Sequence, residues 1–395
     1  MVEVHQAFPL IDLMRPALVI LVLGFAIAFW VTGRPNWSLF VATVKAALFT
    51  VYYGVFFDGT FTFLDDWSYV EGGQHLVEQG VSTINLISHL PELFSLAGGI
   101  HFTYYLFNAD AFRILGDSYY SPVSINVVLT FLAAGLMTFT ARSTLACSRS
   151  LSTGLFVFLV IQPNLLAWST IMNGKDTLVL VCTAAAVYGV TRLENGYYFR
   201  AVVLFIALGL MLFFTRFYLP VFFLVALFGA LLFSPGGRRR WVWWLLVPVG
   251  LIGVFTILGT DMVFSNIDRL QEGFTNPTFG LVRFILTPAP FNTTENYAFL
   301  NLPQVFHWML MPAMVFGIYR IWGKTSLTAK FIVIYFLGMI LFYGMFENLQ
   351  GPRHRYQLEG IIALFQFYGI VGILKQLLYK SRPSNTSPSV SYPSA

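Results

Sequence analysis

Charged side chains are scarce in this sequence, because Asp, Glu, Lys and Arg make up only 10% of its 395 residues. Soluble domains carry about 25% charged residues, so this composition excludes an ordinary soluble enzyme. Hydrophobic residues instead reach 57%, and the mean hydropathy of +0.71 predicts a protein that is embedded in a lipid bilayer. The net charge of +5 is small and spread over short loops, which argues against nucleic acid as a partner.

Cysteine is almost absent, since the chain has only Cys147 and Cys182. Their spacing matches no metal-binding motif, and each falls in or beside an apolar run near the same predicted membrane face, so we expect no disulfide. His89, His101 and His307 are too scattered in the sequence for a recognisable metal site. Structural metal and disulfide chemistry are therefore not expected to hold this fold together.

Long apolar runs dominate what is present. A membrane-spanning helix needs about 20 mostly apolar residues, and this length predicts an all-α polytopic membrane protein with about eleven spans. The first run lacks the small-residue cleavage site of a signal peptide, so we expect it to be retained as a span. The candidate spans are centred on residues 17–33, 38–57, 122–141, 151–171, 177–191, 201–214, 218–233, 242–259, 305–321, 331–346 and 358–378.

The connecting loops sort by charge. The basic residues of alternate loops fall on one side, which the positive-inside rule makes cytoplasmic. These residues are Arg142, Arg149, Arg192, Arg200, Arg238, Arg239, Arg240, Lys324, Lys330, Lys375, Lys380 and Arg382. The opposite side receives two long outer loops, 58–121 and 260–304. An apolar segment in the first loop, 100–116, is interrupted by charges and is expected to form an interfacial helix.

The chain shows no soluble domain and no internal repeat. We therefore expect one transmembrane catalytic domain over residues 1–380, with its chemistry facing the periplasm or an equivalent lumen. The Ser- and Pro-rich residues 381–395 are expected to form a disordered cytoplasmic tail.

An acidic and aromatic cluster opens the first outer loop, where Asp65 and Asp66 are adjacent. Two neighbouring carboxylates repel each other, which raises the proton affinity of one, and burial strengthens this effect. Such a carboxylate suits a general base that takes a proton from a hydroxyl group. The pair could instead bind a divalent cation such as Mg²⁺ or Mn²⁺, or cap an interfacial helix. Glu71 and His75 follow as candidate substrate-binding residues.

Two cations at the outer ends of spans are candidate phosphate ligands. Lys175 follows Asn173-Gly174, and its ammonium can reach a lipid phosphate as a point charge. The alternative is a turn in which Asp176 caps the next helix and Lys175 snorkels. Arg216 has no acidic neighbour in the sequence, so it needs a carboxylate from another helix or a ligand, unless it is an interfacial anchor.

The last outer loop carries three potentially cationic side chains and a tyrosine, namely Arg353, His354, Arg355 and Tyr356. They lie on the side that the positive-inside rule disfavours, and binding of a phosphate or pyrophosphate would explain this departure. The alternative is that they pair with Glu347 and Glu359 to fix the last helix.

Taken in order, these stretches resemble the C-type membrane glycosyltransferase superfamily (GT-C), which uses polyprenyl-phosphate sugars. The resemblance covers roughly residues 38–378 and lies in four motifs. These are the acidic pair Asp65-Asp66, the amphipathic stretch 100–116, the segment 163–176, and the stretch 353–359, which is similar to an Arg-Tyr-Arg-Leu-Pro pattern of that superfamily.

The resemblance implies a glycosyltransferase, inverting at the anomeric carbon, that moves a sugar from a polyprenyl-phosphate donor to a glycan, lipid or protein acceptor. It would lie in a bacterial inner membrane with its active site facing the periplasm. The implied general base is Asp65 or Asp66, and the implied phosphate-binding residues are Lys175, Arg216, Arg353 and Arg355. The candidate substrate-binding residues are Glu71, His75, His101 and Tyr356. We also expect residues 261–302 to close over the acceptor as a lid.

Two other functions fit the same composition. A polysaccharide polymerase or ligase with lipid-pyrophosphate donors would also use outward arginines, but would depend less on an acidic pair. A membrane transporter would place ionisable groups in the middle of its spans and show repeated halves, whereas here the acids lie in loops and no repeat is visible.

Overall fold

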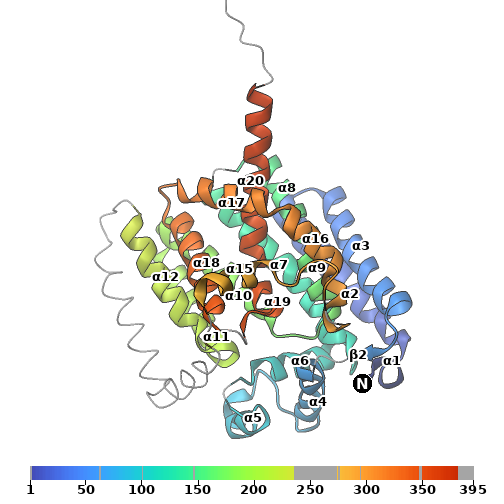
Figure 1. Cartoon of the computed structure of the whole chain (residues 1–395). Helices are drawn as coiled ribbons and strands as arrows, with labels where there is room; N and C mark the ends of the chain where they lie inside the picture. The colour runs from blue at the N-terminus through green and yellow to red at the C-terminus, as the bar shows by residue number, and fades with distance from the viewer. Residues whose placement is uncertain are drawn as a thin grey trace, which may run out of the picture.

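The chain is almost entirely helical in a computed structural model (Figure 1). The structure describes residues 2–61, 64–99, 101–145, 147–234, 274, 276–293, 295–346 and 349–380. Within these residues the strands are limited to β1 (Val2–Glu3) and β2 (Thr60–Phe61), which pair antiparallel with Val2 opposite Phe61. The predicted all-α class is therefore confirmed.

The helices follow one another closely along the chain. The first group is α1 (Val4–Ala7), η1 (Leu10–Leu13), α2 (Met14–Thr32), α3 (Pro35–Val51), the π-helix η2 (Tyr52–Phe56), α4 (Leu64–Glu78), η3 (Leu86–His89), α5 (Leu90–Leu96) and α6 (Thr103–Leu115). The second is α7 (Tyr120–Thr144), α8 (Arg149–Ile161), α9 (Pro163–Ile171), α10 (Asp176–Glu194), α11 (Tyr198–Arg216) and α12 (Leu219–Phe233). The third is α15 (Pro277–Leu286), η4 (Glu295–Leu300), α16 (Asn301–Met309), α17 (Met311–Trp322), α18 (Leu327–Met345), α19 (Pro352–Tyr356) and α20 (Glu359–Lys380).

Seven helices of the described residues are long and apolar enough to cross a membrane, and the bent pair α8–α9 would make an eighth. The seven are Leu10–Thr32, Pro35–Phe56, Tyr120–Thr144, Asp176–Glu194, Tyr198–Arg216, Leu327–Met345 and Glu359–Leu378. These lengths confirm an integral membrane protein, because about 20 apolar residues suffice to cross the hydrocarbon core. The predicted span 242–259 and the predicted tail 381–395 lie outside the described residues.

Two of the predicted spans are broken rather than continuous. The run 151–171 bends by 44° between α8 and α9, where the side chain of Gln162 accepts from the Leu165 amide at 2.8 Å and Pro163 opens the new helix. The run 305–321 is divided at Leu310 into α16 and α17. Proline has no amide hydrogen to donate and is well placed in the first turn of a new helix, which explains both breaks.

The centre of the bundle is formed by α7 and α10. The apolar stretch of α10 is 89% buried and that of α7 is 72% buried, whereas only 22% of the stretch in α11 is buried. The peripheral helices leave many large apolar side chains exposed, including Trp30, Val203 and Leu337. A soluble monomer rarely exposes apolar surface on this scale, so lipid is the fitting neighbour.

The first outer loop folds into α4, α5 and α6, which lie together below the bundle in Figure 1. These helices share a small core of their own around Leu76, Leu93 and Phe102. The end of α20 projects at the opposite side of the molecule in the same view.

Contacts between residues at the ends of helices define the two ends of the bundle. At one end, Asp65 contacts Arg353 and Arg216 contacts Asp176. We call this end the outer rim, after its predicted orientation. At the other end, the inner rim, the Arg142 guanidinium donates to the Val31 carbonyl at 2.7 Å. Loops far apart in the sequence therefore gather as the charge alternation predicts.

Candidate functional site

Asp176 is the centre of a charged cluster at the outer rim. It begins α10, is fully buried, and accepts from Arg216 Nη2 at 2.5 Å and from Arg353 Nε at 2.7 Å. The amide of Gln357 donates to the same carboxylate at 3.1 Å. A carboxylate in the first turn also interacts favourably with the positive end of the helix dipole. One buried anion therefore faces two cations from different helices.

Arg353 connects this centre to the first outer loop. Its Nη1 donates to Asp65 Oδ2 at 2.6 Å while its Nε remains on Asp176. Burial acts to lower the pKa of Arg353, but the Asp176 carboxylate outweighs it and the pKa is raised, so the side chain stays cationic. The Asp65 side chain keeps 49% of its exposure, and it is the acid of this cluster that an external molecule can reach.

Asp66 turns away from its neighbour, as successive residues of a helix must. It is buried, and its Oδ2 accepts from the Tyr119 hydroxyl at 2.8 Å. Its backbone carbonyl accepts from the side-chain amide of Asn173 at 3.3 Å. Burial raises the pKa of Asp66 to about 7, with the Tyr119 hydrogen bond opposing that rise. The two adjacent acids therefore occupy different environments, one at the rim and one beneath it.

The outer rim also holds nitrogen donors that the protein does not use. Lys175 is half-buried and makes no hydrogen bond or ion pair within the described residues; its ammonium lies 5.9 Å from the centre of the Tyr69 ring. Burial, followed by the charge of Arg216, lowers the pKa of Lys175 to about 8. Arg216 Nε is buried and likewise has no partner in the described part of the chain.

Two histidines lie in the electric field of these cations. Burial lowers the pKa of His354 to about 3, and Arg216 contributes to the same shift. Burial lowers the pKa of His101 to about 4, with Lys175 and Arg216 acting in the same direction. Both rings are therefore neutral at pH 7, and each buried Nδ1 has no hydrogen-bond partner among the residues described. A neutral imidazole can still donate one hydrogen to an anion.

A polar network holds the loop that carries Lys175. The side chain of Asn173 donates to Asn108 Oδ1 at 2.7 Å and accepts from the Tyr104 hydroxyl at 2.9 Å. Asn126 donates in turn to the Tyr104 hydroxyl at 2.8 Å. These side chains are buried, so each bond restrains the loop, and the position of Lys175 is fixed relative to α6 and α7.

The structure places Arg355 away from this cluster. Its guanidinium is buried and forms an ion pair with Glu359 at 3.2 Å. The same group donates to the carbonyls of Ile285 and Thr287 and to the Gln304 side chain, at 2.8, 2.5 and 2.7 Å. Pairing with Glu359, the structural alternative for this motif, therefore holds for Arg355. Glu347 lies outside the described residues.

Three further predicted residues are not gathered at the cluster. Glu71 is exposed and accepts from Trp67 Nε1 at 2.9 Å, and His75 is exposed beside Gln79. Tyr356 is buried and stacks on Trp168, with ring centres 5.6 Å apart. Of the residues predicted to bind substrate, His101 alone shares the field of Lys175 and Arg216. Much of the predicted lid, including Asp268, Arg269 and Glu272, falls outside the part of the chain that is described.

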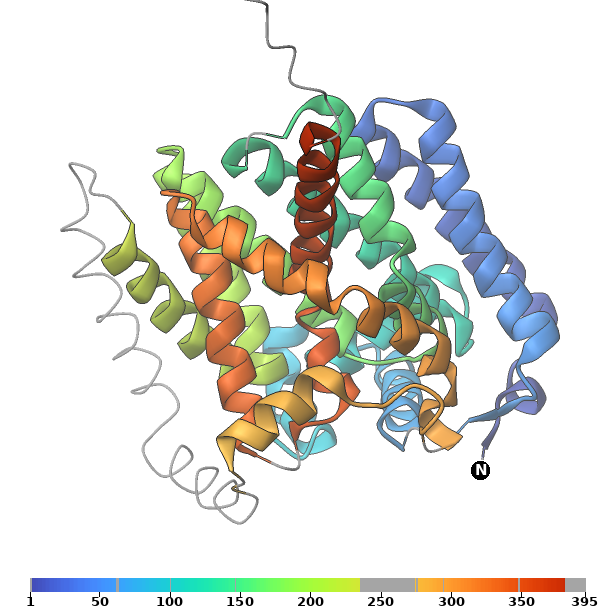
Figure 2. The ribbon, with the colours of Figure 1, turned by 45° about the horizontal axis from the view of Figure 1, so that its top comes forward.

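An apolar groove of about 370 Å³ runs between α12 and α18, which lie side by side in Figures 1 and 2. Its lining includes Phe222, Tyr335 and Phe342. Phe342 packs against Tyr218, with ring centres 5.4 Å apart, and the Tyr218 hydroxyl accepts from Arg216 Nη1 at 3.0 Å. Phe342 of the groove lining is therefore linked through Tyr218 to Arg216 of the outer-rim cluster.

The residues that the sequence did not single out are mainly partners of those that it did. Asp176 was considered as a helix cap and as the end of the segment 163–176, and His354 and Gln357 only as parts of the stretch 353–359, while Tyr119 carried no signal. Within the described residues no group of three or more His, Cys, Asp or Glu side chains could hold a metal ion, and both cysteines are free thiols.

The fold and this cluster define an all-helical membrane protein with acid and cation joined at one rim of the bundle. No protein-family model, curated protein or solved structure matches the chain.

Proposed function

We propose that this protein is a GT-C-type membrane glycosyltransferase that moves a sugar from a polyprenyl-phosphate donor to an acceptor at the outer face of the membrane. The observation that carries the proposal is the half-exposed Asp65 carboxylate, held by Arg353 near Lys175, whose ammonium makes no hydrogen bond or ion pair within the described residues. The eleven-span architecture, the bacterial inner membrane and the periplasmic orientation belong to the same proposal.

The donor phosphate would bind to the donors that have no hydrogen-bond partner in the described part of the chain. Lys175 supplies a cation, and Arg216 Nε and His354 Nδ1 supply buried nitrogen atoms beside it. Preorganised donors in a site of low dielectric stabilise the charge that develops on a departing phosphate. The two cations, Lys175 and Arg216, and the neutral His354 would therefore act on the leaving group rather than on the sugar.

Asp65 is the base in this proposal because an acceptor can reach it. Its carboxylate takes the proton of the acceptor hydroxyl, and the freed oxygen attacks the anomeric carbon. The bond from that carbon to the phosphate oxygen breaks, and its electron pair leaves with the polyprenyl phosphate. Attack opposite the leaving group inverts the anomeric carbon. Asp66, buried against Tyr119, is a positioning residue that holds the start of α4 to the Asn173 loop.

The polyprenyl chain would lie in the groove between α12 and α18. The lining of the groove is mostly apolar, and Phe342 of that lining packs against Tyr218, which contacts Arg216. An isoprenoid in this position stays in contact with the bilayer while its phosphate reaches the charged rim. The same geometry leaves a lipid-pyrophosphate donor as the second candidate, because Arg353 offers one more cation for a second phosphate.

The test incubates purified protein with polyprenyl-phosphate sugars and, separately, with polyprenyl-pyrophosphate sugars, and measures release of the lipid carrier. We expect release from the monophosphate donors. Asp65→Asn should slow it by about 100-fold or more, the scale of a lost general base.

The matched control is Asp117→Asn, an exposed acid of the same outer loop that accepts from Gln74 at 2.9 Å. It should leave the rate unchanged. Full activity of Asp65→Asn would remove the base assignment, and release from pyrophosphate donors alone would replace the proposed function by the second candidate.

A further inference from the structure

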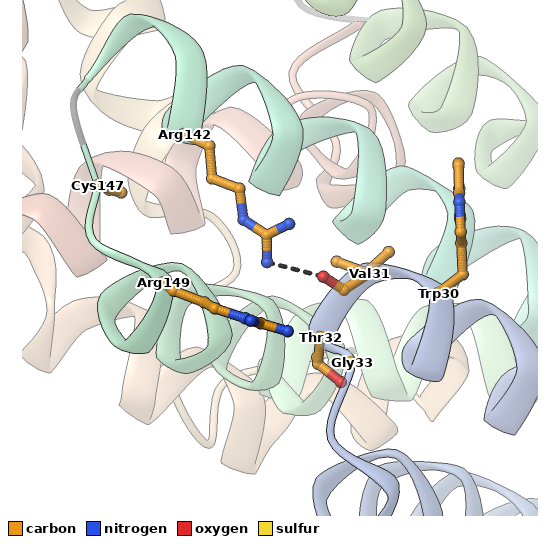
Figure 3. Close-up of a pocket in the computed structure, with 7 residues that line it drawn as sticks. All are labelled: Trp30, Val31, Thr32, Gly33, Arg142, Cys147 and Arg149. Atoms are coloured by element: carbon orange, nitrogen blue, oxygen red, sulfur yellow. Dashed lines mark hydrogen bonds between the residues drawn. The ribbon is translucent and has the colours of Figure 1, made fainter.

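A second cationic site lies at the opposite end of the molecule, and the outer-rim chemistry does not involve it. A cavity of about 430 Å³ opens at the inner rim between the C-terminal end of α2 and the facing ends of α7 and α8 (Figure 3). Its lining includes Trp30, Gly33, Arg142, Cys147 and Arg149, and the described residues that line it include no acid. Two guanidinium groups therefore face one hollow without a carboxylate to neutralise them.

Arg142 is already partly used by the fold. Its Nη2 donates to the Val31 carbonyl at 2.7 Å and its Nε donates to the Ser152 hydroxyl at 2.8 Å. The first bond satisfies one of the carbonyls that the end of α2 leaves free, which is a structural role. Arg142 Nη1 makes no hydrogen bond within the described residues, so one nitrogen of this cavity-lining side chain remains free to donate to a ligand.

Arg149 has no such structural role. Its side chain is exposed and forms no hydrogen bond or ion pair in the part of the chain that is described. It extends below Arg142 toward Thr32 and Gly33 (Figure 3). Gly33 ends α2 with a φ of 64°, and a Cβ atom there would lie 2.7 Å from Arg149 Nη2. A glycine at this turn therefore leaves room for the guanidinium to lie in the cavity.

The surroundings are positive as well. Burial raises the pKa of the Cys147 thiol, while its hydrogen bond with Tyr368 and the charges of Lys375 and Arg142 oppose that rise. Positive charge from α20 thus adds to that of the two arginines. An anion with several oxygen atoms is the ligand that forked guanidinium donors recognise best.

The position of the cavity indicates where such an anion comes from. Trp30 stands at its edge with 63% of its surface exposed, on the lipid-facing side of α2. Tryptophan favours the level of the lipid headgroups, so the cavity lies at headgroup depth. By the positive-inside rule this rim faces the cytoplasmic leaflet, where basic pockets between transmembrane helices bind anionic headgroups.

We propose that the cavity between α2, α7 and α8 binds the phosphate of an anionic lipid headgroup, with Arg149 as its principal donor and Arg142 as the second. A bound headgroup would add a link between the end of α2 and the α7–α8 corner, which the Arg142–Val31 hydrogen bond and the Trp30–Phe139 ring contact already join. This inference does not depend on the proposed function, because it concerns the other face of the membrane.

The experiment measures lipid binding to the full-length protein in detergent by native mass spectrometry, with phosphatidylglycerol, phosphatidylcholine and inorganic phosphate as separate probes. We expect phosphatidylglycerol to bind more tightly than phosphatidylcholine. Arg149→Gln should weaken phosphatidylglycerol binding about fivefold, the effect of one basic residue near a charged surface. Arg149→Lys, which keeps the charge and loses the fork, should fall between.

The matched control is Arg200→Gln, an exposed arginine of the inner rim that lies outside the cavity and contacts Tyr197. It should leave lipid affinity unchanged. Equal losses in Arg149→Gln and Arg200→Gln would reduce the effect to general surface charge and overturn the site. Saturation by inorganic phosphate without competition from phosphatidylglycerol would overturn the lipid as its ligand.

Discussion

The two rims of this protein use arginine in opposite ways. At the outer rim, Arg216 and Arg353 both form ion pairs with the buried Asp176 carboxylate, and Arg353 also pairs with the half-exposed Asp65. At the inner rim, Arg142 donates to a helix-end carbonyl, and Arg149 is exposed and unpaired in the described structure. Buried charges are costly to keep away from water. We therefore expect a functional role for the charged residues of the outer rim rather than for those of the inner rim.

The acids differ in the same way. Glu194 of the inner rim lies beside the start of α18, where its carboxylate accepts from the Leu327 and Thr328 amides at 3.0 and 3.1 Å. This is helix capping from a neighbouring segment, and it uses the carboxylate fully. Asp65 of the outer rim instead accepts from Arg353 and keeps half of its exposure. The comparison indicates that the inner-rim acid closes a helix end, whereas the outer-rim acid Asp65 remains available to a ligand.

The largest effect should follow removal of the outer-rim anion. Asp176→Ala leaves Arg216 and Arg353 without the carboxylate that both contact, and breaking a buried pair in this way costs about 3–5 kcal/mol. Thermal unfolding in detergent should therefore show a large drop in Tm. The exposed Asp117→Asn should show none. An unchanged Tm in Asp176→Ala would mean that the cluster does not hold the outer rim together.

Substitution of Lys175, unlike that of Asp176, should weaken ligand binding without lowering stability. A charged hydrogen bond is worth about 1.5–3 kcal/mol, so Lys175→Gln should weaken binding of polyprenyl phosphate by about tenfold or more. Its Tm should be unchanged or higher, because the ammonium has no partner within the described residues. Lys324→Gln, an exposed inner-rim lysine, is the control. Equal affinity of both variants for polyprenyl phosphate would show that Lys175 does not bind the lipid phosphate.

Asp66 should give the protein a pH signature. Its carboxyl keeps a proton up to about pH 7 in the folded state and loses it near 3.8 when unfolded, so its contribution to stability falls as pH rises between these values. The slope reaches about 1.4 kcal/mol per pH unit. Asp66→Asn, which can still accept from Tyr119, should lack this slope when its Tm is measured against that of the wild type from pH 4 to 7.

The comparison with the wild type matters because the histidines act in the other direction. The pKa values of His101 and His354 are lowered to about 4 and about 3, so their contributions grow as pH rises toward 6.5. They are present in both proteins and cancel in the difference. Identical pH profiles for Asp66→Asn and wild type would show that Asp66 is not protonated in the folded protein.

The smallest effect is expected at the inner-rim acid. Glu194→Gln weakens the cap of α18 and should lower stability by about 1 kcal/mol, as other helix-cap losses do. Carrier release by the folded protein should not change, and the transferase assay checks this. Lost activity with a normal Tm would show that inner-rim charge takes part in the chemistry after all.

The sequence could predict seven of the eleven candidate spans, because a long apolar run has few alternatives in a bilayer. It could not predict where a span breaks. Gln162 and Pro163 together end one helix and start another, and the 44° bend depends on a cap that the apolar pattern does not reveal. The run 305–321 differs, because its Pro312 is a visible sequence signal for the division between α16 and α17.

The sequence could predict that the site residues lie at the same end of the bundle, but it could not predict how they pair. Charge alternation assigned Asp65, Lys175, Arg216 and Arg353 to one end, and the structure joins three of them through Asp176. Which acid pairs with which arginine depends on helix packing, which no local pattern encodes. One distinction was accessible from geometry, since residues two apart on a helix point in nearly opposite directions. Arg353 and Arg355 could therefore not both face the same phosphate.

The most direct test of the outer-rim claim is a structure of the protein with a non-hydrolysable polyprenyl phosphonate. We predict that the phosphonate oxygens lie within about 3 Å of the Lys175 ammonium and of Arg216 Nε, and that the lipid chain lies in the groove between α12 and α18. A phosphonate bound elsewhere, at the inner rim or on the far side of the bundle from Asp65, would contradict it.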